Sequence, residues 1–314
     1  MEHAHDVERP RSATAHAVTE TATVSDVTVP RRLVLHAGDL GMSHGGNLAF
    51  VELSERGTIS SGSVMVPGPW FPEIAAAAAA APALDVGVHL TLCAEGSAYR
   101  WRPVSNVTAA SGLLDDDGYL WPDVASVRRH AQPDAVETEW RAQAERALDS
   151  GIDVTHFDTH MGAALAPELC NRYVRMGAEY RVPVVLTASL RGYAPRLPNL
   201  ADVSDERFSP YADYARKIGL PVFDQVVQTD FTRPPNQSAD YRSVVSGVVG
   251  DLVFCAFHPT SAGDISAIDP HGCHVRTEEY ELFRTAEWHQ WLTKQPFEII
   301  GMRALRDDYR VVVQ

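Results

Sequence analysis

A stretch reading LVLHAGDLGMS, from Leu33 to Ser43, gives the strongest indication of the fold. Its apolar start is typical of a buried β-strand, and Asp39 follows at the point where that strand should end. Gly41 permits a tight turn, and Ser43 is a favourable N-terminal cap for a helix. The stretch therefore predicts a strand–turn–helix unit that carries a carboxylate at the carboxyl end of its strand.

The same alternation of apolar runs and amphipathic stretches continues along the chain. We expect strands at Leu33–Ala37, Ser60–Val66, Leu84–Leu90, Ile152–Thr159, Val182–Thr187, Pro221–Val227, Leu252–Phe257 and Phe297–Met302. We expect helices at Ser43–Arg56, Ile74–Ala81, Val136–Ser150, Ala166–Tyr180, Tyr241–Val249 and Thr277–Thr293. Strands that alternate with helices favour parallel βαβ units. The pattern predicts an α/β fold, a distorted (β/α) barrel, with a doubly wound open sheet as the alternative.

The length of 314 residues fits one core with excursions, since a barrel of this kind typically takes about 250 residues. Residues 1–30 lack hydrophobic periodicity, so we expect a flexible N-terminal extension there and a single domain over 31–314. The extension has no apolar signal core, and a cytoplasmic location is therefore expected. No apolar run reaches the roughly 18 residues that a membrane span needs.

Charge argues against nucleic acid as a partner. The chain has 27 Lys and Arg against 41 Asp and Glu, a formal net charge of −14 at pH 7. Without basic runs it offers little attraction for a phosphate backbone. The cysteines include no CxxC pair, so a thiolate zinc site is not expected either. The sequence leaves the oligomeric state open, a homodimer included.

Polar side chains recur where the predicted strands end. They are Asp39, His89 and His258, each closing an apolar run, and the alternating trio His156, Asp158 and His160. Residues two apart on a strand point to the same face, so the trio shares one side of the sheet. In barrels and open α/β sheets alike, catalytic groups gather at the carboxyl ends of the strands.

These residues predict a metal centre. Asp39, His89 and one member of the trio would bring two imidazoles and one carboxylate together. That set suits Zn²⁺, Co²⁺, Fe²⁺ or Mn²⁺, with open positions for water or substrate. Non-haem iron oxygenases use the same ligand set, which makes an oxygenase a second enzymatic alternative.

Several segments resemble the motifs of the YdjC-like carbohydrate deacetylases. The segment Ala37–Ser43 resembles the family's Ala-Asp-Asp-Phe-Gly motif with its following Ser, and Val86–Leu92 matches Val-Gly-x-His-Leu-x-Leu. The third motif, Thr-His-x-Asp-Ser/Thr-His, has its counterpart at Thr155–His160, and His258-Pro259 matches a His-Pro after an apolar strand. Arg276, followed by acidic residues, resembles an Arg-x-x-Glu before the last helix.

The resemblance implies a metal-dependent hydrolase that removes an acetyl group from an N-acetylated sugar or oligosaccharide. Its metal ligands would be Asp39, His89 and His160, and the ion would be zinc, or else magnesium, manganese or cobalt. Water activated by the metal would attack the amide carbonyl. His258 would protonate the leaving amine, and Asp158 would orient an imidazole from behind. The implied partner is a small carbohydrate.

One position departs from the family pattern. Gly38 stands where the family has its first aspartate, the general base of the motif, and glycine cannot take a proton. Another group, such as His36, His258 or Asp158, could act as the base, or the enzyme could be slow. Alternatively the chain has lost deacetylation and is a catalytically impaired carbohydrate-binding or regulatory protein on the same fold.

Two segments do not fit the strand–helix repeat, namely Gly96–Asp123 and Gly192–Tyr214. Long excursions on a barrel usually form the rim of its active face. The aromatic residues of the first segment either stack on a sugar ring or pin their own loop. Neither segment identifies the sugar or the acyl group.

Overall fold

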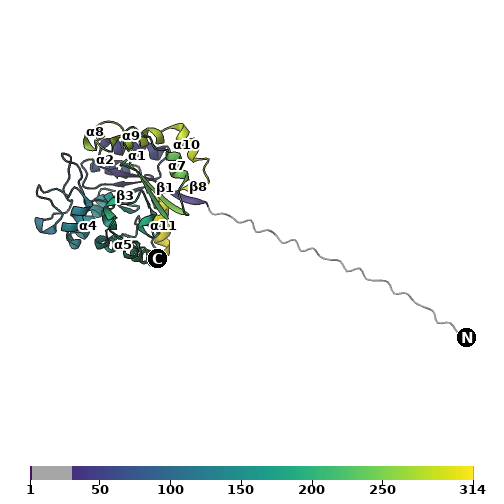
Figure 1. The fold of residues 1–314 in the computed structure, drawn as a ribbon, viewed down its shortest axis with the longest axis horizontal. Helices are drawn as coiled ribbons and strands as arrows, with labels where there is room; N and C mark the ends of the chain where they lie inside the picture. Colours follow the sequence, from purple (N-terminus) through teal and green to yellow (C-terminus); the bar gives the residue numbers. More distant parts are fainter. Residues whose placement is uncertain (2–29, 314) are drawn as a thin grey trace.

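The computed structural model describes Met1 and residues 30–313. The flexible extension expected at residues 1–30 therefore lies almost wholly outside the described residues. None of the described helices is both long enough and apolar enough to cross a membrane. Figure 1 shows the described part as a group of strands enclosed by helices.

The strands form one 8-stranded sheet, in which every pairing between named strands is parallel. Along the hydrogen-bonded path the order is β4-β3-β2-β1-β7-β6-β5, and β8 pairs with β1. Their bounds are β1 Arg31–Leu40, β2 Ser61–Val64, β3 Val86–Leu90, β4 Phe157–Thr159, β5 Tyr193–Ala194, β6 Gln225–Gln228, β7 Leu252–Phe257 and β8 Phe297–Ile299. The first strand is thus central, which places Asp39 in the middle of the sheet edge.

A further segment closes this sheet into a distorted barrel. Isolated parallel bridges join Phe157 of β4 to Val184, and Thr187 to Phe223 just ahead of β6. Backbone hydrogen bonds of 2.9–3.0 Å accompany these bridges. The strand expected at Val182–Thr187 is therefore an extended segment that pairs with its neighbours only through isolated bridges at Val184 and Thr187. The predicted fold class is confirmed, and the open doubly wound sheet was the wrong alternative.

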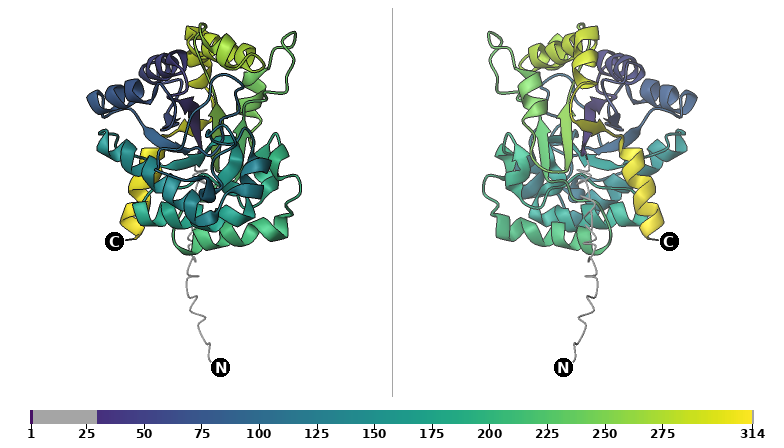
Figure 2. Two further views of the ribbon diagram at one scale, coloured as in Figure 1. Left: turned by 90° about the vertical axis from the view of Figure 1, so that its left-hand side faces the viewer. Right: turned by 90° about the vertical axis from the view of Figure 1, so that its right-hand side faces the viewer.

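Helices surround the strands on all sides of the barrel, as the two views in Figure 2 show. The α-helices are α1 His44–Glu55, α2 Phe71–Ala80, α3 Val124–His130, α4 Pro133–Asp149, α5 Pro167–Tyr180, α6 Asp205–Lys217, α7 Tyr241–Ser246, α8 Ile265–Ile268, α9 Cys273–Phe283, α10 Ala286–Leu292 and α11 Met302–Val312. Short 3₁₀ turns are η1 Ala109–Ser111, η2 His160–Leu165, η3 Leu190–Gly192 and η4 Pro198–Leu200.

The excursion expected at Gly192–Tyr214 is more regular than the sequence suggested, because it contains β5 and most of α6. Ser204 caps this helix, and Phe208 and Ala212 bury one of its faces. Pro210 lies inside the helix and interrupts the pattern that would have predicted it.

Several expected boundaries also differ from those in the structure. The helix expected at Thr277–Thr293 is two helices, because Thr285 has an extended backbone and caps the start of α10. The strands expected at Ile152–Thr159 and Phe297–Met302 are shorter, and the latter gives way to α11 at Met302. None of these differences moves a residue of the predicted site.

Candidate metal centre and active site

Asp39 lies at the end of β1 in a backbone conformation that few residues adopt. Its φ is 59°, and the pairing of β1 with β2 shifts register between Ala37 and Leu40. Such irregularities re-aim a side chain, and aspartate tolerates positive φ better than most residues. Gly41 follows at φ 84°, and its N–H donates to Asn47 Oδ1 at 2.7 Å, which closes the turn into α1. The turn thereby fixes the direction of the Asp39 carboxylate.

This carboxylate lies between two imidazoles and a guanidinium. Its Oδ1 is 3.1 Å from His160 Nδ1 and 3.4 Å from His89 Nε2. Its Oδ2 accepts from Arg276 Nη2 at 2.9 Å. Burial alone would raise the pKa of Asp39, but Arg276 and the neighbouring histidines hold it well below its ordinary value. Asp39 is therefore ionised at neutral pH.

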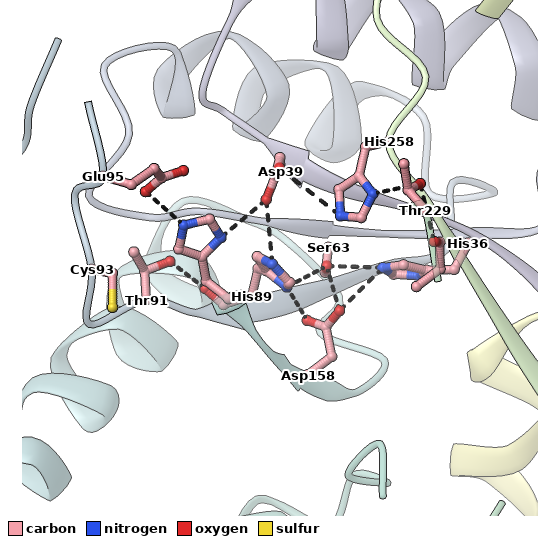
Figure 3. A network of polar contacts seen from close by, with 12 residues as sticks. His36, Asp39, Ser63, His89, Thr91, Cys93, Glu95, Asp158, Thr229 and His258 are labelled. Atoms are coloured by element: carbon pink, nitrogen blue, oxygen red, sulfur yellow. Dashed lines mark hydrogen bonds and ion pairs between the residues drawn. The ribbon is translucent and has the colours of Figure 1, made fainter. Parts of the chain in front are cut away.

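His89, at the end of β3, is oriented by Asp158 of β4. Its Nδ1 donates to Asp158 Oδ1 at 2.7 Å, a contact drawn in Figure 3. Burial would raise the pKa of Asp158, but His89 and His36 hold it well below its ordinary value, so the carboxylate accepts. Nδ1 carries the proton in this contact, which leaves Nε2 to face Asp39.

His160 begins η2, directly after β4, and has a carboxylate of its own. Its Nε2 is 3.0 Å from Glu95 Oε2, and its Nδ1 faces Asp39. Burial alone would lower the pKa of His160, but Glu95 and Asp39 raise it to about 10. Sequence reasoning missed Glu95, because it lies in the irregular chain after β3, where no periodic pattern marks it.

Asp39, His89 and His160 bring one potential ligand atom each to within 4.8 Å of one another. With Asp158 and Glu95 binding the outer nitrogens, the inner nitrogens of both imidazoles converge on the Asp39 carboxylate. Metal-binding histidines almost always pair their second nitrogen with a carboxylate, a carbonyl or water. Two imidazoles and a carboxylate of this kind fit a divalent ion.

His258, after β7, faces the same carboxylate from the other side. Its Nε2 is 3.9 Å from Asp39 Oδ2, and its Nδ1 is 2.9 Å from Thr229 Oγ1. Burial lowers the pKa of His258 to about 3, against the opposing charge of Asp39. The ring is therefore neutral at pH 7, so only one of its nitrogens carries a proton.

A buried carboxylate determines which nitrogen that is. Glu279 accepts from Thr229 Oγ1 at 2.7 Å and from the backbone N–H of His258 at 2.7 Å. Burial raises the pKa of Glu279 to about 7, although these hydrogen bonds oppose the rise. When Glu279 is ionised, Thr229 donates to it and must accept from His258 Nδ1. The lone pair of His258 Nε2 then faces the site.

Gly38 leaves room for this imidazole. A Cβ at this position would lie 2.9 Å from His258 Nε2 and 3.0 Å from its Cδ2, and real Cβ atoms essentially never approach below 3.0 Å. The space next to Gly38 is therefore filled by the ring of His258.

The aromatic residues of the loop at Gly96–Asp123 mostly pin the loop itself. Trp101 is buried and donates from Nε1 to Cys93 O at 2.8 Å, and Trp121 stacks on His130. The Trp101 ring also lies 6.4 Å from that of His160, centre to centre. The loop thus forms one wall beside the candidate centre.

The chain matches the family of YdjC-like proteins over residues 32–294. A carbohydrate deacetylase of Thermus thermophilus is 36% identical over 194 residues, 61% of this chain and 68% of that relative. A carbohydrate deacetylase of Brevibacillus brevis is 28% identical over 276 residues, 87% of this chain and 99% of that one. A crystal structure from Enterococcus faecalis V583, of a candidate cellobiose-phosphate cleavage protein, shares the fold, with a TM-score of 0.70 at 20% identity over 88% of this chain and 99% of that chain. Since the family match extends over most of its length, this chain belongs to the YdjC-like family.

Proposed function

We propose that the protein is a metal-dependent carbohydrate deacetylase, which hydrolyses the acetamide of an N-acetylated sugar to acetate and an amine. The observation that supports this most is the convergence of Asp39, His89 and His160, with the Nε2 lone pair of His258 on the far side of Asp39. The related proteins named carbohydrate deacetylases supply the substrate class.

Asp39, His89 and His160 would hold the ion, with zinc as the first choice and magnesium, manganese or cobalt as alternatives. A divalent ion bound there would act as a Lewis acid on the acetamide oxygen. It would also lower the pKa of a water molecule, so that this water is a nucleophile at neutral pH. Arg276 donates to the Asp39 carboxylate. Asp158 orients the imidazole of His89, and Glu95 orients that of His160.

His258 is the group that we assign to proton transfer. The other two candidate bases are less suitable. His36 is fully buried, and the Asp158 carboxylate already accepts from His89 and Ser63. His258 Nε2 would take a proton from the attacking water as its oxygen adds to the acetamide carbon. The same nitrogen would return the proton to the amine as the C–N bond breaks, so one imidazole acts as base and then as acid.

The assignment predicts a pH dependence that belongs to Glu279. Below pH 7 this carboxyl takes up a proton and can donate to Thr229, which then donates to His258 Nδ1 and removes the lone pair from Nε2. With metal saturating, kcat should fall by about tenfold for each pH unit below 7. The fall in kcat below pH 7 should be absent in Glu279→Gln. The control is the metal content of both proteins, measured at each pH. A wild-type kcat that is level from pH 5 to 8 would contradict the relay.

Restoring the family's aspartate should lower activity rather than raise it. In Gly38→Asp, the new side chain must displace the His258 ring, and a misplacement of about 1 Å can cost on the order of 10²-fold in rate. Gly38→Ala adds the Cβ without a carboxylate and should show a smaller loss. A large gain in acetate release for the aspartate variant alone would instead indicate a deacetylase that had been slowed by losing its base.

Gly38 also supports a second candidate function, a catalytically impaired carbohydrate-binding protein. Acetate release from N-acetylglucosamine and its oligomers, with zinc-loaded protein and a chelated control, separates the two. Zinc-dependent release supports the deacetylase. Binding of these sugars without release, at full metal content, would support the impaired protein.

A further inference from the structure

A second group of potential ligands lies inside the barrel beside the candidate centre. His36 comes from β1, Asp158 from β4, and His156 from the residue just before β4. Both imidazoles are fully buried, and Asp158 is 5% exposed. The proposed reaction uses neither His36 nor His156.

The donor atoms of this group are spaced for a metal ion. One atom from each residue lies within 4.8 Å of the others, and His36 Nε2 is 3.2 Å from Asp158 Oδ2. A tetrahedral ion with bonds near 2.0–2.1 Å separates neighbouring ligand atoms by about 3.3 Å. His36 Nε2 and Asp158 Oδ2 are therefore already spaced like two ligand atoms of one ion.

His156 has a buried lone pair without a partner among residues 30–313. Thr155 Oγ1 donates to Asp85 Oδ1 at 2.6 Å, so at its 3.0 Å contact with His156 Nδ1 it accepts. Nδ1 then carries the proton, and Nε2 is left unprotonated. That nitrogen is buried and makes no hydrogen bond to any residue that the structure describes. A buried acceptor without a donor is costly, and a cation would satisfy it.

Gly87 on the neighbouring strand β3 leaves space for the His156 imidazole. A Cβ at Gly87 in β3 would lie 2.4 Å from both Nδ1 and Cε1 of His156. Only glycine leaves room for the ring there. On β2, Ser63 donates to Asp158 Oδ2 at 2.9 Å, so it accepts from His36 Nε2 at 2.9 Å. An ion bound to this nitrogen would displace that proton.

We propose that His36, His156 and Asp158 form a second divalent-cation site, suited to zinc or cobalt. This site does not depend on the deacetylase activity. It shares Asp158 with the candidate centre, because Oδ1 accepts from His89 while Oδ2 faces His36. A cation on Oδ2 would withdraw charge from the carboxylate that orients His89, so the affinities of the two sites should be coupled.

The test is the number of ions bound by the full chain, measured by elemental analysis after loading with Zn²⁺ and gel filtration. We expect about two ions per chain for the wild type, and about one for either His156→Leu or His160→Ala. The double variant should bind none. His44→Ala removes an exposed imidazole outside both groups and should keep two.

Co²⁺ loading adds a readout that does not require the variants. Two sites with different ligand sets should fill in two steps during an optical titration of the wild type. A single ion per wild-type chain, filling in one step and kept by folded His156→Leu, would overturn the proposal and leave the group as a buried hydrogen-bonding network. Loss of the only ion in His160→Ala would at the same time uphold the candidate centre, so the two failures are distinguishable.

Discussion

Asp39→Asn should abolish metal binding at the candidate centre and lower acetate release by about 10³-fold or more. A divalent ion bound there would contribute several kcal/mol of transition-state stabilisation, and each 1.36 kcal/mol is tenfold in rate. Oδ1 of Asp39 faces both inner imidazole nitrogens, and the neutral amide of asparagine is a much weaker ligand. The measurements are zinc content and acetate release from N-acetylglucosamine oligomers.

The asparagine variant must be shown to fold, because it also removes a charge that faces Arg276. Arg276 keeps a second partner in Asp269 at 2.8 Å, so circular dichroism and thermal melting should show a folded protein. Asp213→Asn makes the same change at an exposed carboxylate on α6 and should leave metal content and activity unchanged. Full zinc content in folded Asp39→Asn would contradict the ligand assignment.

His258→Ala should lower kcat by about 10²–10⁴-fold, the usual contribution of a positioned acid or base. Its Nε2 lies on the far side of Asp39 from His89 and His160, so metal content should not change. KM should change little, because the proton transfers are made after the substrate is bound. Steady-state kinetics at saturating zinc, together with elemental analysis, separate these effects.

Thr229→Val tests separately whether the hydrogen bond to His258 Nδ1 matters for proton transfer. It keeps the shape of the side chain but cannot accept from His258 Nδ1 or donate to Glu279. It should therefore lower kcat in the same direction, by less than His258→Ala. If His258→Ala instead lost its metal, His258 would be a ligand rather than the proton-transfer group. If kcat were unchanged, another base would be at work.

The arrangement of strand ends could be predicted from the sequence because it depends on local pattern and chain geometry. Asp39 and His89 each follow a short apolar run, and parallel strands bring their carboxyl ends to one edge. The period of two along β4 likewise put Asp158 and His160 on the same side. The structure brings these residues together at that edge.

The supporting groups could not be predicted in this way. Glu95 and Thr229 lie in chain that follows strands, and their partners are set by how the barrel closes rather than by spacing. The conflict at Gly38 likewise depends on where the His258 ring packs, 220 residues along the chain. The helix α6 was missed because Pro210 sits inside it.

The most direct test of the account is acetate release measured during a zinc titration of metal-stripped protein, beside His160→Ala. The account predicts that release by the wild type rises with occupancy of the Asp39–His89–His160 centre and levels off when that centre is full. The variant should stay near the uncatalysed rate throughout. Wild-type release that does not depend on zinc or any other divalent ion, or a variant that matches the wild type, would contradict it.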